Sequence, residues 1–380
     1  MHIVFHTHEY PGEGRSHGGV GTVVRFLANR FARQGIRVSV VGINDKAIDE
    51  FEEDGTVKIY RLARSKWKAF RFIDQTNRIL AKLKEIHREH PIDIVEGAEL
   101  TFAFYPRKTP FKKVIRLHGG HHFFAMELGK SPKFWRSFQE KQSFKKADGY
   151  IAVSDYVGRK TREYLRYDFS YQVIYNTLDE QFFQPVADAS PRKNSILFYG
   201  TVCEKKGVRQ LVIAMPEILR QVPDAQLNIV GRDWFFPDGR SYIEYLQTFI
   251  PEAIKPHIRF HGKVPHEKIK EFLANNEVVA LPSHMEAMPL AWIEALLMAK
   301  PFIGGDIGPG REIVKNGETG FLVNPHEPKE IAGKIVWLLQ NKPHARAMGL
   351  KAREYALNLL HPEKIIAENI RFYKNLLTRS

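Results

Sequence analysis

Two glutamates frame the segment "EAMPLAWIE", residues 286–294. A carboxylate is costly to remove from water unless a cation or hydrogen-bond donors bind it. Pro289 favours the first turn of a helix, so we expect Glu286 in a strand-to-helix loop and Glu294 about one and a half turns inside the helix. A ligand at this helix start could set an anionic group on the free N–H groups and its hydroxyls on the carboxylates. A structural interpretation remains open, in which Glu286 complements the helix dipole and Glu294 pairs with a lysine.

Glycine-rich loops with charged residues lie on both sides of this segment. Upstream, "YGTVCEKKG" (199–207) carries Lys205 and Lys206 between an expected strand and an expected helix. Downstream, residues 299–323 read "AKPFIGGDIGPGREIVKNGETGFLV". An open glycine backbone followed by a helix start is suited to binding phosphate, with a lysine to balance the charge. A solvated loop lysine is the alternative for Lys206.

A histidine ends an expected strand in "VIRLHGGHHFF", residues 114–124. His118 there could serve near neutral pH as an uncharged hydrogen-bond donor or acceptor. A structural role is the alternative, since the chain has 16 histidines. His121 and His122 raise the question of a metal site, but no D-x-D or H-E-x-x-H motif accompanies them, so we expect no catalytic metal. Gly19 lies in a glycine loop before the first helix, where its open backbone could face an anionic ligand.

A strand–loop–helix–strand unit occurs twice in the chain. Its first copy has strands at 2–9 and 37–43 around a helix at 22–35, and its second has strands at 195–200 and 225–231 around a helix at 208–222. The repetition predicts an α/β protein with two doubly wound domains. Ligands of such sheets bind beyond the carboxyl ends of the strands, so the cleft between the domains is the expected site. The expected limits are a first domain at 1–182, a linker at 183–194 and a second domain at 195–361, with a helix at 362–380 packing back on the first.

Composition narrows the cellular setting. Among 380 residues there is one cysteine, Cys203, and the N-terminus lacks the zones of a secretion signal, so we expect a cytoplasmic protein. No stretch reaches the roughly 18 apolar residues of a membrane-spanning helix. The net charge of +14 favours a polyanionic partner, which leaves nucleic acid, an anionic membrane surface and phosphorylated ligands.

The motifs together resemble the signature of glycosyltransferase family 4. That family has "S-x-x-E-G-F-P-L-x-x-L-E-A-M-A-x-G-x-P" followed by "E-I-V-x-x-G-x-x-G-x-L-V". This chain supplies matching residues at Ser283, Glu286, Pro289, Leu290, Glu294, Ala295, Pro301, Glu312, Ile313, Val314, Gly317, Gly320, Leu322 and Val323. The resemblance covers nearly the whole chain. It implies the GT-B architecture, in which two Rossmann-like domains face each other across a cleft.

The resemblance implies a retaining glycosyltransferase, specifically a hexosyltransferase. Such an enzyme moves a sugar from a nucleotide-sugar donor, here a UDP- or GDP-sugar, to an acceptor hydroxyl, and needs no metal or other cofactor. The acceptor would be a glycan or lipid-linked molecule in cell-surface polysaccharide or glycolipid assembly. A GT-B epimerase or sugar-phosphate synthase is the nearer alternative. A basic nucleic-acid-binding protein is the distant one, and without a recognisable motif we expect no nucleic acid partner.

The family's site residues map onto this chain one by one. By resemblance, Glu294 accepts the ribose hydroxyls, Lys206 pairs with the diphosphate, and Glu286 and His118 face the transferred sugar. The remaining donor contacts are Gly19 at the first glycine loop, Lys263 near the base, and the backbone N–H groups of Met288, Leu290 and Ala291. Two departures stand out. Thr201 occupies the usual place of a basic residue, for which Lys205, Arg232 or Arg311 could compensate, and Ala287 replaces a glycine.

Basic and aromatic residues alternate in two segments of the first half. These are "RLARSKWKAFR" (61–71) and "KFWRSFQEKQSFKK" (133–146). Basic side chains near an anionic leaflet contribute on the order of 1 kcal/mol each, and aromatic side chains anchor at the interface. We therefore expect a peripheral enzyme at the cytoplasmic face of a membrane. The alternative is a solvated surface with the aromatic rings turned into the core.

Overall fold

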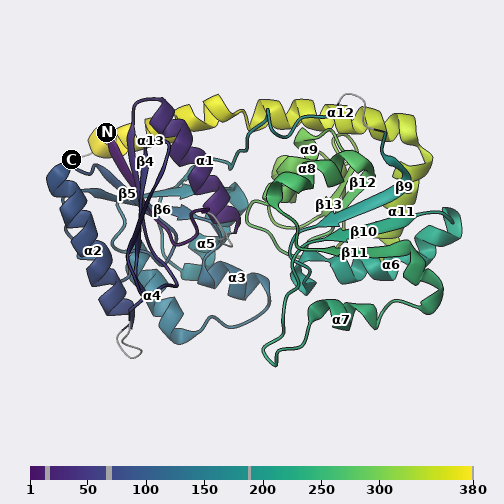
Figure 1. The fold of residues 1–380 in the computed structure, drawn as a ribbon, viewed down its shortest axis with the longest axis horizontal. Helices are drawn as coiled ribbons and strands as arrows, with labels where there is room; N and C mark the ends of the chain where they lie inside the picture. The colour runs from purple at the N-terminus through teal and green to yellow at the C-terminus, as the bar shows by residue number, and fades with distance from the viewer. Residues whose placement is uncertain (13–17, 66–70, 187–189, 379–380) are drawn as a thin grey trace. The chain divides into compact units, whose positions relative to one another are not determined.

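The computed structural model describes residues 1–12, 18–65, 71–186 and 190–378 (Figure 1). The chain divides into two compact units. The first comprises residues 1–177 together with 362–380, and the second comprises residues 178–361. No helix in the described part of the chain has both the length and the apolar character needed to cross a membrane.

The first unit is built on a sheet whose strand order, among the described residues, is β3-β4-β2-β1-β5-β6-β7-β8. All neighbouring pairs are parallel except β3 with β4. The chain therefore leaves β1 in one direction and returns to its other side at β5, which is the reversal of a doubly wound fold. The strands are β1 His2–His6, β2 Arg37–Ile43, β3 Glu50–Asp54, β4 Val57–Leu62, β5 Ile94–Gly97, β6 Lys112–Leu117, β7 Gly149–Ala152 and β8 Gln172–Val173.

Near-continuous apolar runs form the central strands of this sheet, because helices cover both of its faces. Strands β5 and β7 are buried at every position. Helices α1 and α2 lie on opposite sides of the sheet in Figure 1. The helices of this unit are α1 Gly19–Arg33, α2 Arg71–Glu89, α3 His121–Glu127, α4 Phe134–Phe144, α5 Asp155–Leu165 and α13 Pro362–Thr378.

Buried charge ties the C-terminal helix to the first sheet. On β6, Arg116 donates from Nε to Glu96 Oε1 of β5 at 2.7 Å, and from its Nη2 to Asn369 Oδ1 of α13 at 2.5 Å. Tyr373, one turn further along α13, donates to the second oxygen of Glu96 at 2.5 Å. All four side chains are buried. Because these buried hydrogen bonds join α13 to β5 and β6, α13 belongs to the first unit although 184 residues of the second unit separate it in sequence.

Strand β3 is the charged edge of the first sheet. Its alternate residues are exposed, and Glu50, Glu52 and Glu53 discourage pairing with another strand. Arg61 on β4, which the sequence had grouped with a basic membrane-facing segment, is instead buried: its guanidinium donates to the carbonyl oxygens of Tyr10 and Pro11. The expectation for Arg61 was therefore wrong. The aromatic residues of that segment, at 66–70, lie outside the described residues.

The second unit has a sheet of parallel strands in the order β11-β10-β9-β12-β13-β14 within the described chain. Counted from β9, this is the order 3-2-1-4-5-6 of a Rossmann fold, with the switch point between β9 and β12. The strands are β9 Arg192–Tyr199, β10 Gln226–Val230, β11 Ile258–Gly262, β12 Asn276–Leu281, β13 Phe302–Gly305 and β14 Phe321–Val323. The helices are η1 Glu204–Lys206, α6 Val208–Gln221, α7 Tyr242–Gln247, η2 Glu252–His257, α8 His266–Asn275, α9 Leu290–Leu297, α10 Gly310–Ile313, α11 Pro328–Gln340 and α12 Lys342–Leu359.

Some observed boundaries differ from those expected. The units divide between Thr177 and Leu178, and β9 begins at Arg192, so the end of the expected linker 183–194 is already strand. Residues 187–189 of that linker lie outside the described residues. Helix α1 begins at Gly19, three residues earlier than expected, because the small glycines at its start do not prevent helical turns. Gly19 is thus a helix residue and not a loop residue.

The buried cluster around Arg116 generates a stability prediction. Replacing Glu96 with glutamine leaves the Arg116 charge buried without its carboxylate, which should lower the free energy of unfolding by about 3–5 kcal/mol. Urea unfolding followed by circular dichroism measures this. The matched control is Asp168→Asn, since that carboxylate is 96% exposed and 3.7 Å from Arg162; its loss should cost less than about 1 kcal/mol. If both substitutions lowered the free energy of unfolding equally, Glu96 would not be the carboxylate that neutralises a buried charge.

Candidate functional site

Two loops at the switch point of the second sheet bring opposite charges together. Lys206 ends the short helix η1 that follows β9, and Glu286 lies in the loop that follows β12. The Lys206 Nζ atom donates to Glu286 Oε1 at 2.6 Å. Both side chains are mostly shielded, with exposures of 26% for Lys206 and 12% for Glu286. A cation and a carboxylate thus meet at the edge where a doubly wound sheet binds its ligand.

Close backbone packing holds these loops in place. Gly207 has φ +73°, and a Cβ atom there would lie 1.8 Å from the carbonyl oxygen of Pro282. Only glycine fits such an approach in the left-handed region. The amide of His284 also donates to the carbonyl oxygen of Lys205 at 2.8 Å. The position of Lys206 relative to Glu286 is therefore set by the backbone.

Glu294 lies on α9, and its side chain is only 6% exposed. Its Oε1 atom is 2.8 Å from Nε2 of His266, the first residue of α8. This hydrogen bond raises the pKa of His266, against the opposing effect of burial. Tyr199, at the end of β9, donates to the carbonyl oxygen of Ala291, and burial with the nearby Glu294 carboxylate raises its pKa well above its usual value. Glu294 therefore pairs with a histidine, and not with a lysine as the structural interpretation proposed.

The backbone groups expected to bind donor oxygens lie where α9 begins. Pro289 precedes the helix, Leu290 is its first residue and Ala291 its second. Met288 is buried just before them, in the loop that carries Glu286. The first N–H groups of a helix have no partner within the helix, so this turn can accept an anion.

Thr201 stands where the family usually has a basic residue, and an arginine from another loop contacts it. Arg232, which follows β10, donates from Nε to the hydroxyl of Thr201 at 3.3 Å. Arg311 instead forms a two-bond ion pair with Asp306, at 2.6 and 2.8 Å. Of these two arginines, Arg232 is thus the one that contacts Thr201, where the family usually has a basic residue. Lys263 is exposed and follows Gly262, the last residue of β11, at the same edge of the sheet.

In the first unit, His118 follows β6 at the carboxyl edge of the sheet. Burial and the Arg116 charge lower the pKa of His118 to about 3, so the ring is neutral near pH 7. His118 and Val20, the residue after Gly19, line one small cavity. The two neighbouring histidines have protein partners: His121 Nε2 accepts from the Lys133 amide, and His122 Nδ1 lies 2.5 Å from Glu140 Oε2.

A larger pocket of about 770 Å³ opens at the same edge of the first sheet. Residues that follow β1, β2, β5 and β6 line it, among them Glu99 and Gly120. Burial and the neighbouring Glu140 raise the pKa of Glu99 to about 8, despite hydrogen bonds from the amides of His118 and Gly119. A Cβ atom at Gly120 would lie 1.9 Å from Glu140 Oε1, so this glycine makes room for the carboxyl pair. The raised pKa favours the protonated carboxyl, which can donate a hydrogen bond.

Sequence reasoning found part of this arrangement. It identified Lys206, Glu286 and Glu294, but it missed His266 and Glu99. His266 follows Pro265 after a strand, and Glu99 lies just beyond the buried strand β5. A polar residue directly after a strand is a usable signal, although it does not say which partner the side chain meets.

Comparisons with known proteins agree with this fold. The family model described as "Glycosyltransferase Family 4" matches residues 17–182, and that described as "Glycosyl transferases group 1" matches residues 179–355. An N-acetyl-alpha-D-glucosaminyl L-malate synthase of Bacillus anthracis is 23% identical over 95% of this chain and 94% of its own. A GDP-mannose-dependent alpha-(1-6)-phosphatidylinositol monomannoside mannosyltransferase of Mycolicibacterium smegmatis is 26% identical over 82% of this chain and 84% of its own.

Solved structures share the fold along the full chain. Sucrose-phosphate synthase from Thermosynechococcus elongatus superposes with a TM-score of 0.85 at 23% identity, covering 100% of both chains. Anabaena HepE, solved in complex with UDP and glucose, gives a TM-score of 0.77 at 17% identity, covering 99% of this chain and 100% of that one.

The fold is therefore GT-B, with two Rossmann-like domains, and the protein is a glycosyltransferase. The chain belongs to glycosyltransferase family 4. The family models and the mannosyltransferase relative do not favour the epimerase, sugar-phosphate synthase or nucleic-acid-binding alternatives, and the likeness to sucrose-phosphate synthase concerns the fold alone.

The His266–Glu294 contact predicts a pH-dependent stability. Since the folded-state pKa of His266 is raised above 6.5, its protonation contributes stability that is fully present below pH 6.5 and is lost as pH rises through the folded pKa. His266→Gln keeps a neutral donor but cannot take the charge. The melting temperature of the unaltered protein should thus exceed that of His266→Gln most at low pH.

Glu294→Gln provides the control for this measurement, since Glu294 is the main cause of the raised pKa. When both proteins also carry Glu294→Gln, the difference between their melting temperatures should depend little on pH. A difference that instead grows with rising pH would rule out a protonated His266 in the folded state.

Proposed function

We propose that the protein transfers a sugar, with retention of anomeric configuration, from a nucleoside-diphosphate sugar to an acceptor hydroxyl. The observation that carries the proposal is the placement of Lys206, Glu286 and Glu294 at the carboxyl edge of the second sheet, on both sides of its switch point. Relatives support a nucleotide-sugar donor: one is named as GDP-mannose-dependent, and another was solved with UDP-glucose.

The donor's diphosphate would lie between Lys206 and the start of α9. There the amides of Met288, Leu290 and Ala291 would meet phosphate or sugar oxygens, as helix N-termini do for anions. Arg232 would supply the positive charge that Thr201 cannot. The Lys206 ammonium has three donor positions, so it could keep Glu286 while it binds phosphate.

The nucleoside would extend towards Glu294 and Lys263. An ionised carboxylate accepts but does not donate, so Glu294 is suited to two ribose hydroxyls. Its present partner, His266, is 41% exposed and would move or share the carboxylate when ribose binds. The Lys263 stem would pack on the base while its ammonium stays in water.

In the proposed reaction, the bond between the sugar's anomeric carbon and the donor phosphate oxygen breaks, and the diphosphate leaves with the electron pair. The acceptor hydroxyl bonds to the same face of that carbon, and its proton passes to the departing phosphate oxygen. Lys206 and the α9 amides would stabilise the charge that develops on the leaving group. Glu286 would accept hydrogen bonds from the sugar hydroxyls, a role that the resemblance also implies for the ring of His118, and the reaction would need no metal ion or other cofactor. Retention would appear in the NMR coupling of the product's anomeric proton.

We assign the acceptor, a glycan or a lipid-linked molecule of cell-surface polysaccharide or glycolipid assembly, to the pocket of the first unit that Glu99 lines. It has about 770 Å³ of space and lies at the carboxyl edge of the sheet, where this fold binds ligands. Three arginines from different segments line it, at positions 64, 71 and 136. The mannosyltransferase relative is named for a phosphatidylinositol-based acceptor, which supports a lipid-linked molecule.

Peripheral binding at the cytoplasmic face of an anionic membrane is part of the proposal. On α4, Phe134 is 85% exposed, Trp135 51% and Phe138 43%, whereas Phe144 is buried. Three of the four rings in that segment thus face solvent and not the core. Lys133 and Arg136 are exposed beside them, which combines apolar anchors with positive charge.

Donor binding should raise the melting temperature of the protein. A nucleoside diphosphate at 100 times its Kd stabilises the folded state by about 2.7 kcal/mol, which is several degrees for a domain of this size. UDP, GDP and ADP are compared in a thermal-shift assay. Glu294→Ala should abolish the shift because the ribose loses its acceptor.

Glu271→Ala is the control, since that glutamate is exposed on α8 and pairs with Lys268. It should leave the shift intact. If Glu294→Ala folds and keeps the full shift, Glu294 is not in the donor site.

Membrane binding should depend on the α4 rings. Co-sedimentation with vesicles of phosphatidylcholine and phosphatidylglycerol should fall strongly when Phe134, Trp135 and Phe138 are all changed to serine, and should be weak with phosphatidylcholine alone. Trp234→Ser with Phe235→Ser is the control, because these rings are 41% and 57% exposed on the second unit. Absence of binding to anionic vesicles at low salt would refute the membrane proposal.

A further inference from the structure

The second unit has a pocket at the edge of its sheet opposite to Lys206 and Glu286. It lies where β12 and β13 begin, since Glu277 and Val278 are the second and third residues of β12 and Pro301 precedes β13. Its volume is about 410 Å³, within the range of roughly 300–1,000 Å³ for small-molecule sites. Because parallel strands have their carboxyl ends at the other edge, this pocket is separate from the proposed donor site.

The walls of the pocket are mainly apolar. Met298 follows α9, Leu338 lies on α11 and Leu350 on α12. Leu350 is 56% exposed, whereas Met298 and Leu338 are buried. An apolar group that entered between them would be shielded from water by three separate elements.

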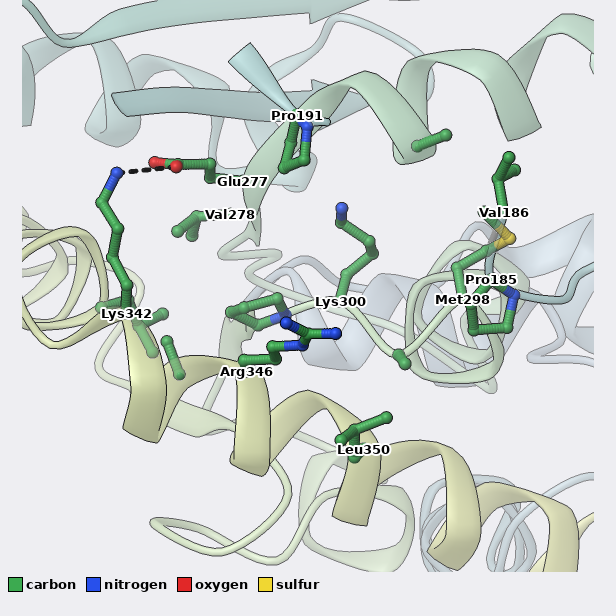
Figure 2. Close-up of a pocket in the computed structure, with 15 residues that line it drawn as sticks. Pro185, Val186, Pro191, Glu277, Val278, Met298, Lys300, Lys342, Arg346 and Leu350 are labelled. Atoms are coloured by element: carbon green, nitrogen blue, oxygen red, sulfur yellow. Dashed lines mark hydrogen bonds and ion pairs between the residues drawn. The ribbon is translucent and has the colours of Figure 1, made fainter. Parts of the chain in front are cut away.

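Two cations point into this apolar space (Figure 2). Lys300 comes from the turn after α9, and Arg346 comes from α12. Among the described residues, no hydrogen bond or ion pair engages the Lys300 ammonium or the Arg346 guanidinium. Burial lowers the pKa of Lys300 to about 8, although the Glu277 charge opposes this. A desolvated ammonium without an acceptor gains most from a bound anion.

The nearby Glu277 carboxylate is not a hydrogen-bond acceptor for Lys300 or Arg346. Glu277 Oε1 accepts from Lys342 Nζ at 2.7 Å (Figure 2). Its Oε2 accepts from the backbone N–H of Asn194 at 2.7 Å. With Glu277 and Lys342 neutralising each other, Lys300 and Arg346 leave an excess of positive charge in the pocket.

The backbone just before Lys300 has an unfavourable conformation. Ala299 has φ +54°, a left-handed conformation that non-glycine residues rarely adopt. Gly349 of α12 makes room for this turn, since a Cβ atom there would lie 2.1 Å from the Ala299 carbonyl oxygen. The amide of Lys300 closes the turn by donating to the Ala295 carbonyl oxygen at 3.0 Å. Packing thus fixes the backbone turn from which the Lys300 side chain extends.

We propose that this pocket binds a small amphipathic anion, with its carboxylate or phosphate between Lys300 and Arg346 and its apolar body against Met298, Leu338 and Leu350. The proposal does not depend on the donor or the acceptor of the transfer reaction.

Isothermal calorimetry with octanoate tests the proposal. Octanoate should bind the full chain in a one-to-one complex, whereas octanol, which lacks the charge, and acetate, which lacks the apolar chain, should bind far more weakly. Lys300→Met and Arg346→Met should each weaken octanoate binding by at least about tenfold, as expected for the loss of a charge-assisted hydrogen bond. Octyl phosphate in place of octanoate shows whether phosphate or carboxylate is preferred.

Two variants separate this result from misfolding and from other surfaces. Lys300→Arg keeps the charge and should retain binding, and Lys351→Met removes an exposed charge of α12 outside the pocket and should leave binding unchanged. Octanoate binding that survives both Lys300→Met and Arg346→Met, octanol binding as tight as octanoate, or no binding of either anion would overturn the proposal.

Discussion

The parallel direction of the strands is the constraint on which the functional architecture depends. In the second unit it gathers the loops after β9, β10, β11 and β12 at one edge of the sheet. Lys206, Arg232, Lys263 and Glu286 reach that edge from four different loops, so none of them needs to be near another in sequence. The ion pair between Lys206 and Glu286 then shows that the two central loops meet.

Buried charge has different roles in the two units. Around Arg116, hydrogen bonds to Glu96 and Asn369, with that of Tyr373 to Glu96, join α13 to the first sheet. The same Arg116 charge, together with burial, keeps His118 neutral. Beside it, burial and then the neighbouring Glu140 raise the pKa of Glu99. The Arg116–Glu96 ion pair and the Glu99–Glu140 carboxyl pair thereby influence the pKa values of the groups at this edge of the first sheet.

Helix α9 connects two places where the second unit can hold anions. Its first turn lies beside Glu286, and the turn after its last residue presents Lys300 to the pocket at the opposite edge of the sheet. A close backbone approach packs the turn after α9 against Gly349 of α12. The helix between these two places is short and mostly buried.

The sequence by itself determined the two-fold α/β organisation, the family, and the positions of Lys206, Glu286 and Glu294 relative to strands and helices, since these follow from periodicity and local motifs. Only the tertiary structure decided that His266 pairs with Glu294, that Arg232 reaches Thr201, that Arg61 is buried, and that Phe134, Trp135 and Phe138 face solvent. The physical reason is that hydrophobic period and turn chemistry act over a few neighbouring residues. Partners 28 or 31 positions apart meet only through the packing of the whole sheet, which leaves no local trace.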